Sequence, residues 1–341
     1  MFPLILELKK IGDLKVKIML TGQHRDMVGG VMRAFGITPD YDLQVMRIGQ
    51  TLFDLSSDIL KGAEPVLTEC MPDIVFVEGD TASAYFGALS AFYLGIPIAH
   101  IEAGLRSYDI REPFPEEAYR IFISDIAAYN FAPTEMSYNN LIKEGRRSAY
   151  LVGNTVCDAL RLTEGLGRSY ASRDKRTVLL TTHRRENQGE RQISIFRAAK
   201  MIARSHPEIE IIYPVHKNPK IRLLADKMLG DIPGITMTEP LGVFDFHSTL
   251  RDSYMVLTDS GGVAEESAAL GVPSLILRDK SERMEAIDCG ASLLASTECE
   301  KIFSLFESVF EKESVYYKMR TAKNPFGDGY ASKRIADILF K

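Results

Sequence analysis

The hydrophobic pattern alternates between two kinds of segment. Short runs rich in β-branched residues are apolar on both faces, and longer stretches with amphipathic spacing separate them. This alternation is typical of parallel sheet in doubly wound α/β units. The expected strands are Lys15–Leu20, Asp73–Val77, Ile96–Ile101, Ala149–Val152, Thr177–Thr182, Glu210–Val215, Tyr254–Thr258 and Ser274–Leu277. The expected helices are Met1–Leu8, Ile48–Cys70, Ala82–Leu94, Pro115–Ala128, Glu190–Ser205, Pro219–Leu229, Gly262–Leu270, Ile302–Glu311 and Tyr330–Lys341.

The chain is long enough for about two domains, at ~150 residues each. The stretch Glu164–Arg176 is polar, contains two glycines and several charges, and has the composition of a hinge between two sheets. We therefore expect the first domain to span residues 1–160 and the second to begin at residue 161.

Composition and charge narrow the function classes. The net charge of -5 argues against a general nucleic-acid binder, which needs a basic excess. The four cysteines lie far apart, so neither a disulfide framework nor a metal site is expected, and a cytoplasmic location fits. No run approaches ~18 apolar residues, so no membrane insertion is expected. The sequence contains no G-x-G-x-x-G and no Gly-Lys pair, which disfavours NAD-dependent and P-loop chemistry.

A first candidate site begins at Asp259, where a strand, two glycines and a helix follow one another. Backbone N–H groups of Ser260, Gly261 and Gly262 at a helix start suit a phosphate or diphosphate. Glu266 lies in the first turns of this helix, where a carboxylate can grip a ribose diol. The alternative is a plain tight turn with Ser260 as the helix N-cap.

A second candidate site lies at the ends of two earlier predicted strands. His183 and Arg184 come directly after strand Thr177–Thr182, at the end where open α/β sheets bind ligands. A histidine beside arginines suits an anion and can also move a proton; the alternative is a solvated polar loop. His216 follows another strand, and Arg283 is a candidate diphosphate ligand.

Three carboxylates in the first domain form a third candidate site. Asp80 and Glu102 each follow a parallel-type strand, and Glu116 opens a helix. Clustered carboxylates can hold different pKa values and so divide acid and base work. The alternatives are an N-cap role for Asp80 and a helix-dipole role for Glu116.

Taken in order, these motifs resemble the non-hydrolysing UDP-N-acetylglucosamine 2-epimerases. The resemblance runs over nearly the whole chain. The matching stretches are Thr21–Arg25, Gly79–Thr81, His100–Arg106, Pro115–Glu117, Gly153–Thr155, His183–Glu186, Tyr213–His216, Asp259–Gly262 and Asn324–Gly329.

The resemblance implies two Rossmann-like doubly wound domains facing a cleft, as in GT-B glycosyltransferases. The second domain would span residues 161–322, and residues 323–341 would cross back to the first domain. The implied reaction interconverts UDP-GlcNAc and UDP-ManNAc for surface polysaccharide synthesis, in a homodimer and with no cofactor.

The resemblance also assigns roles to residues. Asp80, Glu102 and Glu116 would carry the acid and base chemistry, and His183 would assist the leaving diphosphate. The residues expected to bind the substrate are Arg184, His216, Phe246, Ser260, Gly261, Gly262, Glu266 and Arg283. Gln23 and His24 match a region where the bacterial enzymes bind a second UDP-GlcNAc as an activator.

The chain departs from the family at its beginning. The family starts with a central strand and a Gly-Thr-Arg-Pro-Glu loop, whereas Met1–Ile5 matches the helix after that loop. A start site assigned downstream is the favoured explanation, and a degenerate copy is the other. Loss of a central strand should expose strand edges. Two other functions stay open: a GT-B glycosyltransferase, and a UDP-sugar-binding protein without catalysis.

Overall fold

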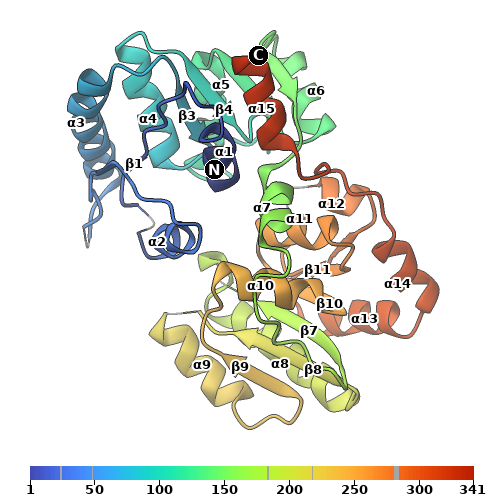
Figure 1. Ribbon diagram of the computed structural model, residues 1–341. Helices are drawn as coiled ribbons and strands as arrows, with labels where there is room; N and C mark the ends of the chain where they lie inside the picture. The colour runs from blue at the N-terminus through green and yellow to red at the C-terminus, as the bar shows by residue number, and fades with distance from the viewer. Residues whose placement is uncertain (24, 48, 183, 217, 280–283) are drawn as a thin grey trace. The chain divides into compact units, whose positions relative to one another are not determined.

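The computed structural model describes residues 1–23, 25–47, 49–182, 184–216, 218–279 and 284–341 (Figure 1). The chain divides into two compact units, here called unit 1 (residues 1–159 and 326–341) and unit 2 (residues 160–325). No helix in these ranges is long and apolar enough to cross a membrane.

Unit 1 is built from short parallel strands and helices. Its elements are α1 (Phe2–Leu8), β1 (Met19–Leu20), α2 (Arg25–Ala34), β2 (Tyr41–Asp42), α3 (Leu52–Cys70), β3 (Val75–Glu78), α4 (Ala82–Tyr93), β4 (Ile98–Ile101), α5 (Glu116–Ile126), β5 (Tyr129–Ala132), α6 (Glu135–Lys143), β6 (Ala149–Leu151), the first part of α7 (Thr155–Thr163) and α15 (Ala331–Phe340). The strands form a parallel pair β1-β2 and a parallel four-stranded sheet β3-β4-β5-β6.

Unit 2 contains one six-stranded parallel sheet. Its elements after α7 are β7 (Arg176–Thr181), a 3-10 turn at Arg185–Asn187, α8 (Glu190–Ser205), β8 (Ile209–Pro214), α9 (Pro219–Leu229), β9 (Ile235–Thr238), α10 (Val243–Arg251), β10 (Met255–Thr258), α11 (Gly261–Ala269), β11 (Ser274–Ile276), α12 (Glu285–Asp288), β12 (Ser292–Leu294), α13 (Cys299–Phe310) and α14 (Glu313–Arg320). The strand order is β12-β11-β10-β7-β8-β9, which confirms the doubly wound fold class.

Alternate residues of β7 show how the sheet of unit 2 is covered. Val178 and Leu180 point to one face and pack with apolar residues of α8 and α13. Leu179 points to the other face and packs with Leu250 of α10. A strand covered on both faces must be apolar throughout, which is why its sequence reads as one continuous hydrophobic run.

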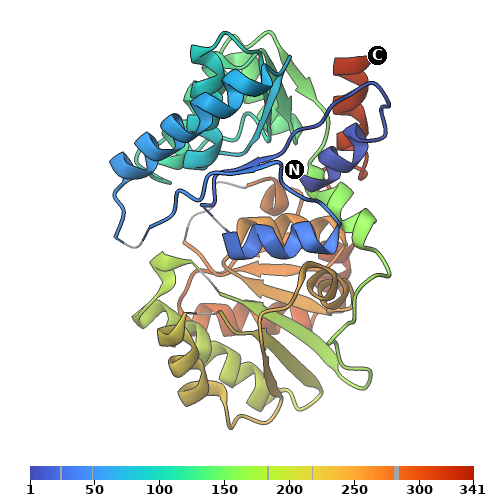
Figure 2. The ribbon, with the colours of Figure 1, turned by 60° about the vertical axis from the view of Figure 1, so that its left-hand side comes forward.

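The sheet of unit 1 is also covered on both faces. Val77 and Ile98 pack with α3, α4 and α5 on one face. Ala99 and Ile101 pack on the other face with α1 and the C-terminal helix α15, which lie side by side in Figure 2. The last helix of the chain therefore belongs to the core of unit 1.

Two matched motifs meet where α15 begins. The buried carboxylate of Asp158 accepts the first two backbone N–H groups of α15 at 3.0 and 2.9 Å, which caps that helix. The N–H of Asn154 donates to the carbonyl of Phe326 at 2.7 Å. A Cβ atom on Gly327 would lie 3.2 Å from the Cα of Gly153, so this close approach favours glycine at both positions.

Most predicted elements are confirmed with shifts of a few residues at their ends. One strand needs correction: Lys15–Leu20 is a strand only over Met19–Leu20. It pairs only with the two-residue β2 among the described strands, so its ladder is short. The sequence interpretation also left out β2, β5, β9 and β12, which contain polar residues or are only two to four residues long.

Candidate functional site

The sheet of unit 2 changes direction between β7 and β10, because chain connections run outward from this pair in both directions. The crevice beyond the carboxyl ends of such a pair is the usual ligand site of an open α/β sheet. The hydroxyls of Thr181 and Thr258 share a hydrogen bond of 2.6 Å there. The fully buried carboxylate of Asp259 accepts the Arg184 N–H at 3.1 Å and the Asn187 amide at 3.0 Å, tying the two loops together.

Helix α11 begins at this edge. The Ser260 side chain accepts the Val263 N–H at 3.4 Å, so the N-cap interpretation of Ser260 is confirmed. Gly261 and Gly262 are the first two helical residues. The first N–H groups of a helix have no partner within the helix, and its dipole favours negative charge at this end. The cap and the expected anion site are therefore compatible.

Two other predicted ligands lie on the helices beside this edge. Glu266 is on α11, and its carboxylate faces the His247 ring with 3.6 Å between Oε1 and Nε2. Phe246 is half-buried on α10 and packs against the apolar cluster formed by β7, β8 and β10. Both residues thus come from elements that flank the switch point.

Of the remaining predicted residues of unit 2, Arg184 and His216 lie in the loops after β7 and β8. Arg184 is half-buried directly after β7, where its backbone contacts Asp259. His216 is exposed after β8, and its Nδ1 accepts the N–H of Asn218 at 3.0 Å. His183 and Arg283 lie outside the described residues.

In unit 1, the structure brings Asp80 and Glu102 to the same sheet edge. They follow the neighbouring parallel strands β3 and β4, in which Glu78 is paired with Ile101. A Cβ atom on Gly79 would lie 3.0 Å from the Glu102 carboxylate, so this side chain rests against the Asp80 loop. Gly79 and Glu102 both have positive φ, at 71° and 64°.

A buried histidine contacts the loop that contains Gly79 and Asp80. His100 on β4 is fully buried, and its Nε2 contacts the Gly79 carbonyl at 2.9 Å. Burial lowers the pKa of this imidazole to about 4, with nearby arginine charge adding to the effect. The ring is therefore neutral near pH 7 and donates to Gly79 from Nε2.

Asp80 is not the cap of α4, so that alternative is wrong. Thr81 caps the helix by accepting the Ala84 N–H at 3.2 Å, whereas the Asp80 carboxylate contacts the Arg120 guanidinium. Arg120 lies four residues after Glu116 on α5, which places the two on one helix face. The third predicted carboxylate thus lies on the face of α5 that reaches Asp80.

Sequence interpretation missed two residues that organise this edge. Glu117 is fully buried and accepts the N–H groups of Ser107 and Tyr108 at 2.9 and 3.0 Å. It also accepts from Arg120 at 3.1 Å, so one guanidinium bridges Glu117 and Asp80. Glu117 lies in the matching stretch Pro115–Glu117, but the local pattern that links it to Arg120 is an i,i+3 Glu–Arg pair, which a solvated helix face shows equally well.

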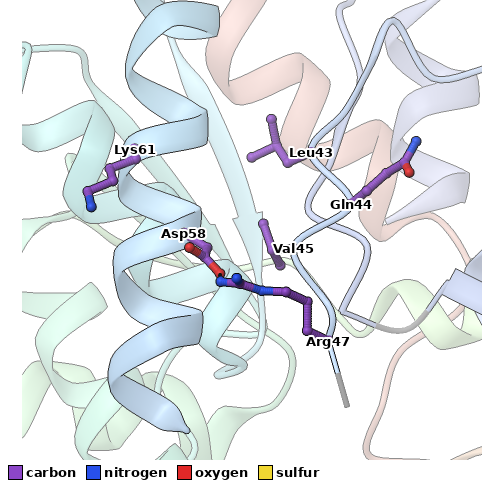
Figure 3. A pocket seen from close by; sticks show the side chains of 6 residues that line it. All are labelled: Leu43, Gln44, Val45, Arg47, Asp58 and Lys61. Carbon is purple, nitrogen blue, oxygen red and sulfur yellow. Dashed lines mark hydrogen bonds and ion pairs between the residues drawn. The ribbon is translucent and has the colours of Figure 1, made fainter. Parts of the chain in front are cut away.

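Of the two residues expected to bind an activator, the structure describes only Gln23. The Gln23 amide oxygen accepts the Ser83 N–H at 3.1 Å and its hydroxyl at 2.6 Å, at the start of α4. His24 lies outside the described residues. A shallow hollow of about 300 Å³ opens between α3 and the segment after β2, where Arg47 pairs with Asp58 (Figure 3). Its lining residues are Leu43, Gln44, Val45, Arg47, Asp58 and Lys61.

Parallel, doubly wound units with polar residues at the carboxyl ends of their strands are typical of α/β proteins with a GT-B-like fold. A glycosyltransferase of kitacinnamycin has the same fold, with a TM-score of 0.69 and 12% identity over 99% of this chain and 94% of that one.

The particular family follows from closer relatives. Residues 6–340 match the family model described as UDP-N-acetylglucosamine 2-epimerase. The chain is 42% identical to the UDP-N-acetylglucosamine 2-epimerase of Bacillus subtilis, over 99% of this chain and 91% of that protein. It is similar to the crystal structure of the Neisseria meningitidis UDP-GlcNAc 2-epimerase bound to UDP-GlcNAc, with a TM-score of 0.91, 36% identity and coverage of 99% and 95%. The chain belongs to the UDP-N-acetylglucosamine 2-epimerase family.

Proposed function

We propose that this protein interconverts UDP-GlcNAc and UDP-ManNAc by inverting C2 of the sugar. The observation that carries the proposal is the family match over residues 6–340, in a chain that keeps a carboxylate edge in unit 1 and a helix-start edge in unit 2. In this proposal Asp80, Glu102, Glu116 and His183 act on the sugar and the leaving group. The UDP ligands are Arg184, His216, Phe246, Ser260, Gly261, Gly262, Glu266 and Arg283.

The chemistry explains why carboxylates and a diphosphate site are needed together. The C2 proton of the sugar has no adjacent carbonyl, so a carboxylate alone does not remove it readily. When the C1–O bond to UDP breaks, C1 gains oxocarbenium character, and the C2 proton becomes acidic enough for a positioned carboxylate. Loss of that proton forms the C1=C2 double bond of a 2-acetamidoglucal.

The return steps complete the epimerisation. A carboxylic acid on the opposite face donates a proton to C2, while a UDP oxygen forms the bond to C1 again. Helix-start N–H groups and cationic side chains stabilise the negative charge on the departing UDP. Substrate and product are at the same oxidation level, so the reaction consumes no redox equivalent.

The test is turnover of UDP-GlcNAc in D₂O, followed by proton NMR and mass spectrometry. We expect UDP-ManNAc with one deuterium at C2, and the same label in recovered UDP-GlcNAc. Asp80→Asn, Glu102→Gln and Glu116→Gln should each lower turnover by ~10²–10⁴-fold, the usual range for acid–base groups, while leaving UDP affinity within a few-fold. Glu135→Gln is the matched control, because Glu135 is an exposed residue in the first turn of α6.

Other outcomes would point to other functions. Epimerisation without deuterium at C2 contradicts the proton chemistry. UDP binding without turnover of either sugar nucleotide indicates a binding protein, and sugar transfer to an added acceptor indicates a glycosyltransferase. Loss of UDP binding in the three carboxylate variants would make those residues structural.

We also propose a homodimer that associates through α4 and α5. Phe92 and Phe122 are 52% and 42% exposed. Phe92 lies seven residues after Tyr85 on one face of α4, and the Tyr85 ring lies 5.8 Å from that of Phe122. Light scattering should report a dimer that Phe122→Glu converts to monomer, whereas Leu223→Glu on α9, where Leu223 is 73% exposed, should leave the dimer intact.

The cellular role follows from the substrate. We propose that the protein works in the cytoplasm and supplies ManNAc units for surface polysaccharide. Its four cysteines are free thiols, which fits a reducing compartment.

A further inference from the structure

The carboxylate of Glu266 has an unusual environment. Its Oε2 atom is buried and has no hydrogen-bond partner among the described residues. The side chain as a whole is 17% exposed, so it is not simply solvated. A buried polar atom without a partner costs free energy, which makes such an atom a candidate for contact with a ligand.

The other oxygen of this carboxylate faces a buried histidine. Oε1 of Glu266 lies 3.6 Å from Nε2 of His247, whose side chain is 4% exposed on α10. The other ring nitrogen, Nδ1, lies 2.8 Å from the hydroxyl of Thr163 on α7. The imidazole on α10 therefore lies between a hydroxyl on α7 and a carboxylate on α11.

The Thr163 hydroxyl can select which ring nitrogen of His247 carries the proton. This hydroxyl lies 2.8 Å from Nδ1 of His247 and 3.1 Å from the Leu160 carbonyl oxygen. When the hydroxyl donates to Nδ1, the neutral ring carries its proton on Nε2. That arrangement directs Nε2–H at Oε1 of Glu266.

We propose that His247 is a positioning residue that aims Glu266 at the ribose hydroxyls of the nucleotide. Nε2–H holds Oε1, which leaves Oε2 to accept from the sugar diol, and Thr163 fixes the orientation of the ring. The separation of 3.6 Å between Nε2 and Oε1 is longer than a hydrogen bond; hydrogen bonds at a site without its ligand are often long and tighten when the ligand binds. This inference rests on the proposed binding of UDP by unit 2.

The experiment compares UDP with 2′,3′-dideoxy-UDP by calorimetry, because only UDP carries the hydroxyls. The wild-type chain should bind UDP at least ~10-fold more tightly, since hydrogen bonds to a charged group are stronger than those between neutral groups. His247→Leu should remove most of this preference by weakening UDP and leaving dideoxy-UDP within about twofold. His247→Gln, which keeps an N–H donor near the Nε2 position, should retain most of it.

A matched control breaks a second histidine–glutamate pair in the same unit. His206→Gln disrupts the contact of 2.5 Å between Nε2 of His206, which follows α8, and Oε1 of Glu307 on α13, and should leave the preference for UDP unchanged. Thr163→Val should lower the preference partly while keeping side-chain volume, so the inference remains testable if His247→Leu does not fold. Thermal unfolding of every variant checks folding separately.

Several results would overturn the inference. Equal weakening of both nucleotides in His247→Leu means a structural role. An unchanged preference in both His247→Leu and Thr163→Val means that neither residue acts on Glu266. If the wild-type chain binds the two nucleotides equally well, Glu266 does not bind the ribose hydroxyls, although the proposed binding of UDP still stands. No wild-type binding of UDP at all contradicts the proposed function itself.

Discussion

Replacing Arg120 by methionine should destabilise unit 1 strongly. The guanidinium is 5% exposed and bridges a fully buried carboxylate, Glu117, and a partly buried one, Asp80. Methionine fills much of the volume of the arginine stem but removes the charge. Glu117 would keep its two backbone donors and lose its only described cation.

The expected magnitude comes from the burial of this pair. Removing one partner of a buried ion pair costs roughly 3–5 kcal/mol, because the other charge remains desolvated. A typical domain has only ~5–15 kcal/mol of stability, so the loss would be a large fraction of the total. Glu117→Gln keeps an oxygen that accepts the N–H groups of Ser107 and Tyr108. It also removes the buried charge that Arg120→Met leaves without a partner. The double variant with Arg120→Met should therefore be more stable than Arg120→Met alone by about 1–3 kcal/mol.

Urea unfolding followed by circular dichroism and tyrosine fluorescence measures the change, since the chain has no tryptophan. Hydrogen exchange of peptides from α4 and α5 assigns the loss to unit 1, because two units need not unfold together. Arg120→Lys is the conservative control and should lose less than Arg120→Met. A cost below about 1 kcal/mol for Arg120→Met, or simple additivity in the double variant, would refute the argument that a buried charge is stranded.

The remaining predictions concern one titration and two glycines. The pKa of His100 falls from 6.5 to about 4 on folding, so the unfolded chain takes up the proton first as the pH drops. The free energy of unfolding should therefore fall by roughly 3 kcal/mol between these two pH values. His100→Asn should flatten the plot of the urea midpoint against pH in this range. Gly104→Ala should cost roughly 3 kcal/mol, since φ is +90° and the new Cβ would lie 2.2 Å from the Ser137 carbonyl oxygen. A Cβ atom on Gly30, in α2, would meet no atom within 4 Å, so Gly30→Ala should raise stability by up to ~1 kcal/mol. Thermal melts of both glycine variants measure these changes. No change in stability for Gly104→Ala would contradict the steric argument.

The doubly wound fold was predictable because its strands are covered on both faces. Val178, Leu179 and Leu180 are all fully buried, so the hydrophobic run itself marks a central parallel strand. The strand β5 was not recognised because Asn130 interrupts its apolar run. This asparagine is 1% exposed and donates to the Ser124 carbonyl at 3.4 Å, a contact that only the folded chain reveals.

The sequence predicts which residues lie at the strand ends of the candidate site, because sheet topology sets those positions. It does not predict which side chains contact one another there. Strand ends indicated the positions of Asp80, Glu102 and Ser260, because parallel strands place their carboxyl ends at one sheet edge. No sequence rule indicated that Arg120 reaches Asp80 across 40 residues of chain. Similarly, no sequence rule indicated that the Gln23 amide oxygen accepts the Ser83 N–H at the start of α4.

The two units follow the same order of elements, and this explains why the strands of unit 1 form two separate sheets. In unit 2, β7 lies between β8 and β10 and pairs with both. In unit 1, the series β1, β2, β3, β4, β5 repeats the series β8, β9, β10, β11, β12, each strand being followed by a helix. No described strand of unit 1 takes the place of β7, so β1 and β3 have no shared neighbour. The break between the sheets is therefore a consequence of topology, and the strand sequences on either side need not be poor sheet formers.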